Sequence, residues 1–433
     1  MTSSADNLQR GWCPGALRPM ESGDGLVVRV KPRAGGFDVD TLIALAHAAS
    51  RYGNGQIDLT RRANLQLRGV THETLQRLLE TLGERGLLDA NAEAEAVRNI
   101  LVSPLAGIDP SEVVDVRPLA VELTRLLHLD RALWRLPGKF GFLIDGGGAL
   151  PLDAERADIR LRAVPAADAA QIAVGVDRSG GTLWLGLASP GAAPQAAVRV
   201  AHAFLAAQPA GGRARLRDLS ESGAEGFRAA LSGFLDPIGS PPLPRARNSP
   251  VGVLNDGAHA FAVGLAAPFG RVEGGTLRAL GAALAAAGVK ELRLSPWRIL
   301  YAPIRRGIPA DRVLGAAAAL GLMVDGKNPL LKVSACPGAP ACRSATTDTR
   351  GDARLLAAAL EVHPEIHSVH VSGCAKGCAR SEPAEVVLVA RDNGYDVVHN
   401  GTAADPPETT IPSSELRALP LLLANKRGAP HHG

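Results

Sequence analysis

Four of the five cysteines lie within one window of 43 residues, where they form two closely spaced pairs. Five residues separate Cys336 from Cys342, and three separate Cys374 from Cys378. A cubane [4Fe-4S] cluster takes one thiolate on each of its irons, and two loops with two cysteines each meet this need. Zinc sites more often use pairs roughly two to four residues apart, and buried cysteines also occur as unconnected core residues. The spacing favours the iron–sulfur cluster over these two alternatives.

The residues around the cysteines predict loops that bring them together. Residues 335–342 read A-C-P-G-A-P-A-C, a small, proline-containing segment that suits a loop around a cluster. Residues 366–371 alternate in character and predict a strand that runs into the second pair. We therefore expect Cys374 and Cys378 on the turn after this strand. Cys13 stands alone near the N-terminus, and its role stays open.

The N-terminal part of the chain predicts a small unit of strands and helices. Strands are expected at 26–30, 56–59 and 64–70, and helices at 41–51 and 72–83. This order is typical of a ferredoxin-like half-domain.

The same unit recurs later in the chain. Residues 41–60 and 276–295 align without gaps and share seven identities in twenty positions. We interpret this as a duplicated chain with pseudo-twofold symmetry. The predicted fold class is α+β, with duplicated ferredoxin-like half-domains and two larger α/β domains of the sirohaem and iron–sulfur type.

The domain boundaries follow from composition. Residues 236–250 contain five prolines and no helical pattern, which predicts a linker between the halves. We expect half-domains at 1–85 and 251–325, a larger α/β domain at 86–235, and an iron–sulfur domain at 326–433.

Composition excludes several classes of protein. Hydrophobic residues make up 46% of the 433 residues, enough for buried cores. Basic and acidic residues are mixed, with a net charge of +4 and no basic run, so nucleic acid is not an expected partner. No apolar stretch reaches about 18 residues, and the polar start lacks a signal peptide's core, so we expect a cytoplasmic protein without a membrane partner.

The cysteine spacing and three further segments resemble the sulfite and nitrite reductase family. Residues 58–70 read D-L-T-R-R-A-N-L-Q-L-R-G-V and are similar to the family's D-I-T-T-R-Q-N-W-Q-I-R-G-V. Residues 97–110 are similar to V-R-N-P-V-G-N-P-L-A-G-I-D-P, and residues 136–140 to L-P-R-K-F. The resemblance implies a [4Fe-4S] cluster coupled to sirohaem, with Cys378 as the cysteine that bridges to the haem iron.

The resemblance also implies an anionic-ligand site. It places Arg62, Arg68 and Arg98 on basic residues of the family and Lys139 on an active-site lysine, our candidate catalytic residue. A tetrapyrrole fringed by carboxylates needs several fixed basic groups, and guanidinium–carboxylate pairs serve best. We therefore expect tetrapyrrole-binding roles for Arg61, Arg62, Arg68, Arg98 and Arg298. A solvated surface charge is the ordinary alternative for each arginine.

Departures from the family pattern indicate one branch of it. Gly141 stands where sulfite reductases have a second lysine, and Gly138 replaces an arginine. Residues 10–14, 19–26 and 372–379 resemble the branch that uses dioxygen to hydroxylate precorrin-3A to precorrin-3B, with lactone formation, in aerobic cobalamin biosynthesis. This implies a monooxygenase with precorrin-3A and dioxygen as substrates. A sirohaem-dependent sulfite or nitrite reductase is the alternative, and a non-catalytic iron–sulfur electron carrier is a third.

The expected source of electrons is a separate protein. No Gly-x-Gly-x-x-Gly follows a predicted strand, so we expect an NADH-dependent reductase as partner. Activation of oxygen needs iron outside the cubane, either sirohaem or a mononuclear non-haem iron. The eleven histidines show no 2-His-1-carboxylate spacing, and we assign no ligand to such an iron.

Overall fold

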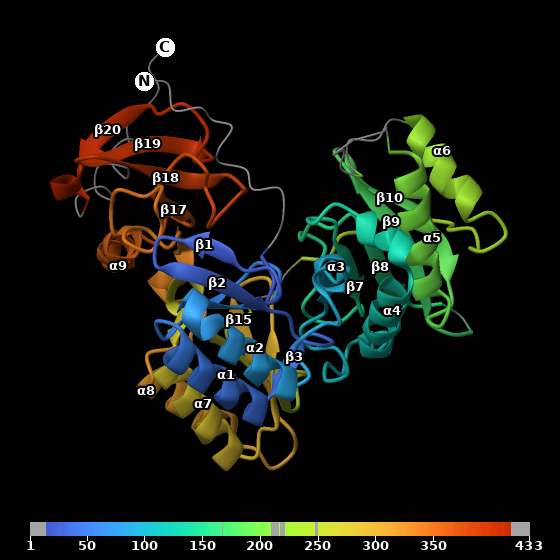
Figure 1. Ribbon diagram of the computed structural model, residues 1–433, viewed down its shortest axis with the longest axis horizontal. Helices are drawn as coiled ribbons and strands as arrows, with labels where there is room; N and C mark the ends of the chain where they lie inside the picture. Colours follow the sequence, from blue (N-terminus) through green and yellow to red (C-terminus); the bar gives the residue numbers. More distant parts are fainter. Residues whose placement is uncertain (1–13, 167, 209–215, 217–220, 247–249, 417–433) are drawn as a thin grey trace.

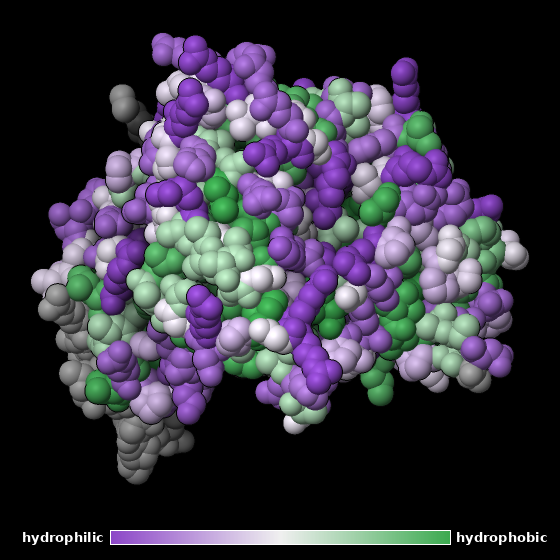
Figure 2. Space-filling view, turned by 90° about the horizontal axis from the view of Figure 1, so that it is seen from below, coloured by the Kyte–Doolittle hydropathy of each residue, from purple (hydrophilic) through white to green (hydrophobic). Residues whose placement is uncertain are grey.

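The computed structural model describes residues 14–416 except 167, 209–215, 217–220 and 247–249, so Cys13 lies outside the described residues. The described chain forms four five-stranded sheets with helices packed on them (Figure 1). No helix within these ranges is long and apolar enough to cross a membrane. Figure 2 shows hydrophilic side chains over much of one face, with apolar surface in separate patches between them.

The first sheet has the order β1-β2-β5-β4-β13. Its strands are β1 (Met20–Ser22), β2 (Gly25–Val30), β4 (Gln56–Leu59), β5 (Leu65–Val70) and β13 (Arg271–Glu273). All neighbouring strands in it are antiparallel. Four strands thus come from the first half of the chain and one comes from the second.

The second sheet repeats this arrangement, with the order β11-β12-β15-β14-β3. It contains β3 (Gly36–Asp38), β11 (Gly252–Asn255), β12 (Ala260–Ala266), β14 (Glu291–Leu294) and β15 (Ile299–Pro303). The two half-domains have therefore exchanged their third strands.

The exchanged strands sit at matching places. Phe37 of β3 lies opposite Leu292 of β14, and Val272 of β13 lies opposite Ile57 of β4. These side chains are buried in one core shared by both sheets. The sequence repeat predicts the duplication, but the exchange was not foreseen.

Helices cover the paired sheets from one side. They are α1 (Val39–Tyr52), α2 (His72–Glu84), α7 (Gly274–Ala286) and α8 (Ala310–Ala319). Helices α1 and α7 lie side by side (Figure 1), and a Cβ at Gly281 would lie 2.6 Å from the Ile43 side chain. Glycine at this position allows the close approach of the two equivalent helices.

The third sheet has the order β10-β9-β8-β7-β6. Its strands are β6 (Ile100–Val102), β7 (Phe142–Asp145), β8 (Ile159–Val164), β9 (Gln171–Arg178) and β10 (Gly181–Ala188). Strands β6, β7 and β8 run parallel to one another, whereas the pairs β8–β9 and β9–β10 are antiparallel. The helices of this part of the chain are α3 (Ala92–Val97), α4 (Arg117–Leu129), α5 (Ala193–Ala206) and α6 (Glu221–Ala230).

The fourth sheet has the same succession of parallel and antiparallel pairs. It contains β16 (Val333–Ala335), β17 (Val369–Ser372), β18 (Ala384–Arg391), β19 (Gly394–Gly401) and β20 (Thr409–Pro412). The larger units are therefore a second duplicated pair.

Helix α9 (Thr349–Ala359) connects β16 to β17 in the fourth sheet. Strand β17 begins three residues later than the sequence pattern predicts. The Ile366 N–H bonds to the His363 carbonyl and closes a turn there, so the alternation starts before the strand does.

Candidate functional site

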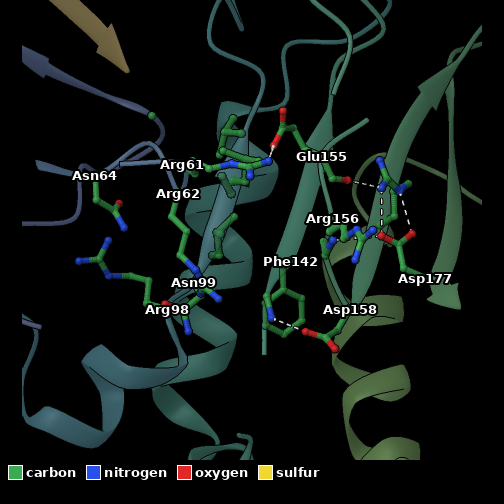
Figure 3. A pocket seen from close by; sticks show the side chains of 18 of the residues that line it. Arg61, Arg62, Asn64, Arg98, Asn99, Phe142, Glu155, Arg156, Asp158 and Asp177 are labelled. Atoms are coloured by element: carbon green, nitrogen blue, oxygen red, sulfur yellow. Dashed lines mark hydrogen bonds and ion pairs between the residues drawn. The ribbon is translucent and has the colours of Figure 1, made fainter. Parts of the chain in front are cut away.

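A cavity of about 530 Å³ lies between the first half-domain and the third sheet. Its volume is in the range of small-molecule sites. Nine basic and four acidic residues line it, together with an apolar wall that includes Ile100, Val121 and Phe142. Figure 3 shows Arg62 and Arg98 on one side of the cavity and Asp158 and Asp177 on the other. The cavity suits an apolar ligand with a negatively charged rim.

Four of the predicted site residues meet in this cavity: Arg61, Arg62, Arg98 and Lys139. Arg62 lies in the turn between β4 and β5, and its Nη2 donates to the Lys139 carbonyl oxygen at 3.1 Å. The Lys139 side chain is exposed. Within the described part of the chain, no carboxylate bonds to Arg62, so its charge is available to an anion.

Arg98 lines the same cavity but is already engaged. Its Nε and Nη2 donate to the Asp89 carboxylate at 2.9 Å, and both side chains are nearly fully buried. Its Nη1 donates to the Pro32 carbonyl oxygen. Arg98 therefore fixes the cavity wall and brings little uncompensated charge to it.

Arg61 connects the cavity to the cysteine region. It forms a two-pronged ion pair with Glu382, at 2.6 and 3.0 Å, and donates to the Ser381 hydroxyl at 3.0 Å. On the cavity side, Glu155 lies 3.9 Å away (Figure 3). Burial lowers the pKa of Arg61, but the bonded Glu382 carboxylate outweighs it and the net direction is upward.

The structure does not bring Arg68 and Arg298 to the cavity. Arg68 is buried, pairs with Asp24 at 2.7 Å, and donates to the Ala341 carbonyl oxygen at 3.0 Å. Arg298 donates to the Ala379 carbonyl oxygen at 3.1 Å. Both arginines hold loops that carry cysteines, because their acceptors lie one residue from Cys342 and Cys378.

A buried carboxylate joins several of these arginines. Asp58 on β4 accepts hydrogen bonds from Arg271 at 2.7 and 2.8 Å, from Arg350 at 3.3 Å, and from Arg68 at 3.4 Å. Burial alone would raise the pKa of Asp58, but these three guanidinium groups bring it down to about 2. This network ties both half-domains to α9, between the two cysteine pairs.

The four clustered cysteines lie at the loops that the sequence predicts. Cys336 follows β16, and Cys374 and Cys378 follow β17. Burial raises the pKa of the Cys378 thiol, Lys376 opposes this, and the other three cysteines raise it further. The four thiols thus share one electrostatic neighbourhood and contain no disulfide.

The fit of this loop set to a cluster rests on one close contact. The Gly373 N–H donates to the Cys336 Sγ at 3.1 Å, and a Cβ at Gly373 would lie 2.5 Å from the Ala345 side chain. Backbone N–H donors to sulfur are a usual feature of iron–sulfur sites. Among the described residues, no three or more His, Cys, Asp or Glu side chains are gathered closely enough to hold a metal ion, and this includes the four cysteines as they lie here.

Sequence reasoning missed Lys31, which lines the cavity at the end of β2. Its ammonium donates to the Glu95 carbonyl oxygen at 2.5 Å and to Asn99 Oδ1 at 3.1 Å. Burial, and next the charge of Arg98, lower the pKa of Lys31 to about 7. No sequence signal distinguishes this lysine, because its chemistry depends on burial.

Asn99, beside Arg98, was also missed. Its Nδ2 donates to the carbonyl oxygens of Gly138 and Phe140 at 3.3 and 3.1 Å. Asn99 therefore holds the loop of Lys139 against the cavity. The sequence offered one indication of its role, because Asn99 follows Arg98 in residues 97–110, which resemble the reductase family.

Two regions of the chain match two domain families that both occur in nitrite and sulfite reductases. Residues 18–85 match the "Nitrite/Sulfite reductase ferredoxin-like half domain", and residues 93–235 match the "Nitrite and sulphite reductase 4Fe-4S domain". With these matches and the relatives described next, the chain belongs to the nitrite and sulfite reductase family. Residues 93–235 contain no cysteine, so the four clustered cysteines lie in the second copy of the larger unit. Family membership supports an iron–sulfur protein of oxidoreductase type.

Relatives of two kinds cover most of the chain. A precorrin-3B synthase from Sinorhizobium sp is 35% identical over 93% of this chain and 85% of its own length. A sulfite reductase [ferredoxin] from Mycobacterium tuberculosis is 27% identical over 83% of this chain and 69% of its own. The solved structure of the Mycobacterium tuberculosis NirA protein superposes with a TM-score of 0.75 at 23% identity, covering 94% of this chain and 82% of that one. The last comparison establishes the fold.

Proposed function

We propose that this protein hydroxylates precorrin-3A to precorrin-3B with dioxygen, with lactone formation, in cobalamin biosynthesis. The observation that carries the proposal is the cationic cavity that Arg61 joins to the turn after Cys378. The similarity to a precorrin-3B synthase along 93% of the chain supports the same reaction.

Basic residues of the cavity bind the carboxylates of the substrate, and apolar residues contact its ring system. Arg62 and Lys139 offer positive charge to the carboxylates at the rim of the substrate, and Lys31 adds a third cation from the end of β2. The ring system lies against the apolar wall formed by Val121 and Phe142. A flat ligand with a carboxylate rim satisfies both surfaces at once.

The electron path begins at the cysteines. Cys336, Cys342, Cys374 and Cys378 hold a [4Fe-4S] cluster, which supplies single electrons delivered by a separate NADH-dependent reductase. Sirohaem is itself a carboxylate-fringed tetrapyrrole, so the cavity's cations fit it as they fit the substrate. If sirohaem is resident, Cys378 and these cations hold it, and it supplies the iron for oxygen chemistry.

A sirohaem-dependent sulfite or nitrite reductase is the second candidate, favoured by the relatives with that activity. Gly141 argues against it. This glycine lines the cavity where sulfite reductases have a lysine, and a Cβ there would meet nothing closer than 3.7 Å. Packing therefore does not demand glycine, and the missing cation is a feature of the site itself.

Labelled oxygen tests the proposal. The reaction takes one ring double bond, one ring acetate, one dioxygen, two electrons and two protons. One oxygen atom becomes the hydroxyl on one carbon of the double bond, the acetate closes the lactone on the other and gives up its proton to that hydroxyl, and the second oxygen atom leaves as water. With ¹⁸O₂ and a reductant, we expect one labelled oxygen atom in the product by mass spectrometry. An unlabelled product, or rapid six-electron reduction of sulfite by the same preparation, contradicts the proposal.

A further inference from the structure

The ion pair between Arg61 and Glu382 lies where the cavity meets the cysteine region. Arg61 lines the cavity from the turn between β4 and β5. Glu382 belongs to the segment of residues 379–382, which directly follows Cys378. The pair therefore links the candidate ligand site to the backbone of a candidate cluster ligand.

Two arginines hold this segment from turns that the duplication relates. Arg61 binds Ser381 and Glu382, and Arg298 binds the Ala379 carbonyl oxygen. Arg298 lies in the turn between β14 and β15, at the position equivalent to Ala63, and both residues have a positive φ. The Arg298 contact is to main chain and is partly buried, so it persists when side chains at the other anchor change partners.

The Arg61–Glu382 pair is open to exchange. The two side chains are 35% and 42% exposed, whereas those of Arg98 and Asp89 are 5% and 1% exposed. Half-exposed ion pairs contribute about 0–1 kcal/mol, because water competes for both partners. An incoming carboxylate replaces Glu382 at little cost, while it cannot replace Asp89 without separating a buried carboxylate from its close partner.

We propose that, while the cavity is empty, Glu382 binds Arg61 at the place that a carboxylate of the ligand takes when the cavity is filled. The ligand carboxylate then displaces Glu382 from Arg61 and releases the segment after Cys378 from this arginine. This inference rests on the proposed function, since it needs a ligand with carboxylates. Glu382 is then a positioning residue that couples filling of the cavity to the environment of the cysteine cluster.

The coupling has a definite direction. With the cavity empty, two arginines of the half-domains hold the segment, Arg61 and Arg298. With a carboxylate on Arg61, Arg298 remains as the anchor from the half-domains, beside the segment's own bond from the Arg380 N–H to the Gly377 carbonyl oxygen. The Glu382 carboxylate then turns to solvent, which removes a negative charge from the neighbourhood of Arg61 and leaves the ligand's charge in its place.

Affinity for uroporphyrin III, a stable porphyrin with eight carboxylates, tests the displacement in the protein with its cluster. We expect Glu382→Gln to tighten binding about two- to fivefold, the range that corresponds to an exposed ion pair. Glu361→Gln, an exposed glutamate of the same domain, is the matched control and should leave binding unchanged. In an Arg61→Gln background, Glu382→Gln should have no further effect.

The electron paramagnetic resonance spectrum of the reduced cluster gives a second readout. We expect the probe to alter the wild-type spectrum, and Glu382→Gln without probe to show part of the same change. If the wild type binds the probe but Glu382→Gln binds it equally or more weakly, the displacement is wrong and the proposed function stands. If the wild type does not bind the probe at all, both fall.

Discussion

Arg68 donates from its Nη2 to the carbonyl oxygen of Ala341 at 3.0 Å, and thereby fixes the residue that precedes Cys342. The arginine belongs to β5 of the first half-domain, and the cysteine lies in the loop between β16 and α9. Asp58 lies behind Arg68 and also accepts from Arg271 and Arg350. The position of a candidate cluster ligand thus depends on a carboxylate almost 300 residues away in sequence.

Replacing Asp58 should destabilise the protein and loosen the cysteine loop. Asp58→Asn keeps the shape but takes the carboxylate from Arg271 and Arg350 and leaves Arg68 with Asp24 alone, at a cost of about 3–5 kcal/mol in the free energy of unfolding. Urea denaturation measures this. Because the folded pKa is about 2 against an ordinary 3.8, the wild-type contribution of Asp58 is full above pH 3.8 and is lost as pH falls toward 2. An equally acid-sensitive Asp58→Asn variant contradicts this account.

The four clustered cysteines should each be needed for the cluster. Serine at Cys336, Cys342, Cys374 or Cys378 should sharply lower bound iron and acid-labile sulfide, because each thiolate is expected on its own iron. Cys13→Ser is the control and should keep both at wild-type levels. Loss of the cluster in that control, with retention in Cys374→Ser, overturns the assignment.

Arg62 and Arg98 should separate into a binding and a structural residue. Arg62→Ala removes a charged hydrogen-bond donor and should weaken uroporphyrin III binding by about one to two orders of magnitude, with little change in unfolding free energy. Arg98→Ala removes the close partner of the buried Asp89, which keeps only the longer contacts to Arg33 at 3.7 Å and His128 at 3.5 Å, and should lower the free energy of unfolding by up to about 3–5 kcal/mol. Equal stability of the two variants contradicts the distinction.

Lys31 should make ligand binding depend on pH near neutrality. Its pKa of about 7 means that the ammonium loses its proton as pH rises past 7, while ligand carboxylates stay ionised. Affinity for the probe should therefore fall by up to about tenfold per pH unit above 7. Lys31→Arg keeps its charge and should flatten this profile, and Lys31→Gln should bind weakly at pH 6 as well.

The same pKa has an opposite signature in stability. The folded value lies below the ordinary 10.5, so the unfolded chain binds more protons between pH 7 and 10.5. The contribution of Lys31 to stability should therefore increase with pH across this window and be absent from Lys31→Gln. If the free energies of unfolding of the wild type and of Lys31→Gln depend on pH in parallel, the lowered pKa of Lys31 in the folded protein is wrong.

Gly141→Lys should shift the site toward small anions. The position lines the cavity and has room for a side chain, so the variant should fold normally. The added cation should increase sulfite binding, measured by competition with the probe, and the added bulk should slow precorrin-3A turnover. Gly141→Ala adds a methyl group without charge and separates the two effects. Unchanged sulfite binding in Gly141→Lys contradicts our reading of this position.

The sequence was sufficient for most of the predicted strands and helices of the first half-domain and for the loops that carry the cysteines, and it was insufficient for the partners of the arginines. The strand at 56–59 matches β4 in both bounds, because Gly55 with its positive φ precedes the strand and the turn that contains Arg61 and Arg62 follows it. Arg61 and Arg62 are neighbours in a recognisable motif and do line the cavity. Motifs identify such residues because local spacing determines them.

Arg68 lies in the same motif as Arg62 but points elsewhere, because Asp24 from the turn between β1 and β2 and Asp58 from β4 both bind it. The acceptors Ala341 and Ala379 are main-chain atoms, which no residue pattern marks. Contacts between remote segments, and the burial that sets the pKa of Lys31, arise only in three dimensions. These features separated the predicted arginine set into cavity residues and loop anchors.

The exchange of β3 and β13 imposes an order of events during synthesis. Phe37 cannot meet Leu292 until the chain between them, more than 250 residues, has left the ribosome. At about 5–20 residues per second this takes roughly 10 to 50 seconds, during which β3 has no strand to pair with. Strand β3 has only three residues, which makes it a poor template for pairing with other chains while it waits. The first half-domain therefore completes its strand exchange only after the second half-domain has been synthesised, and the shortness of β3 makes that delay tolerable.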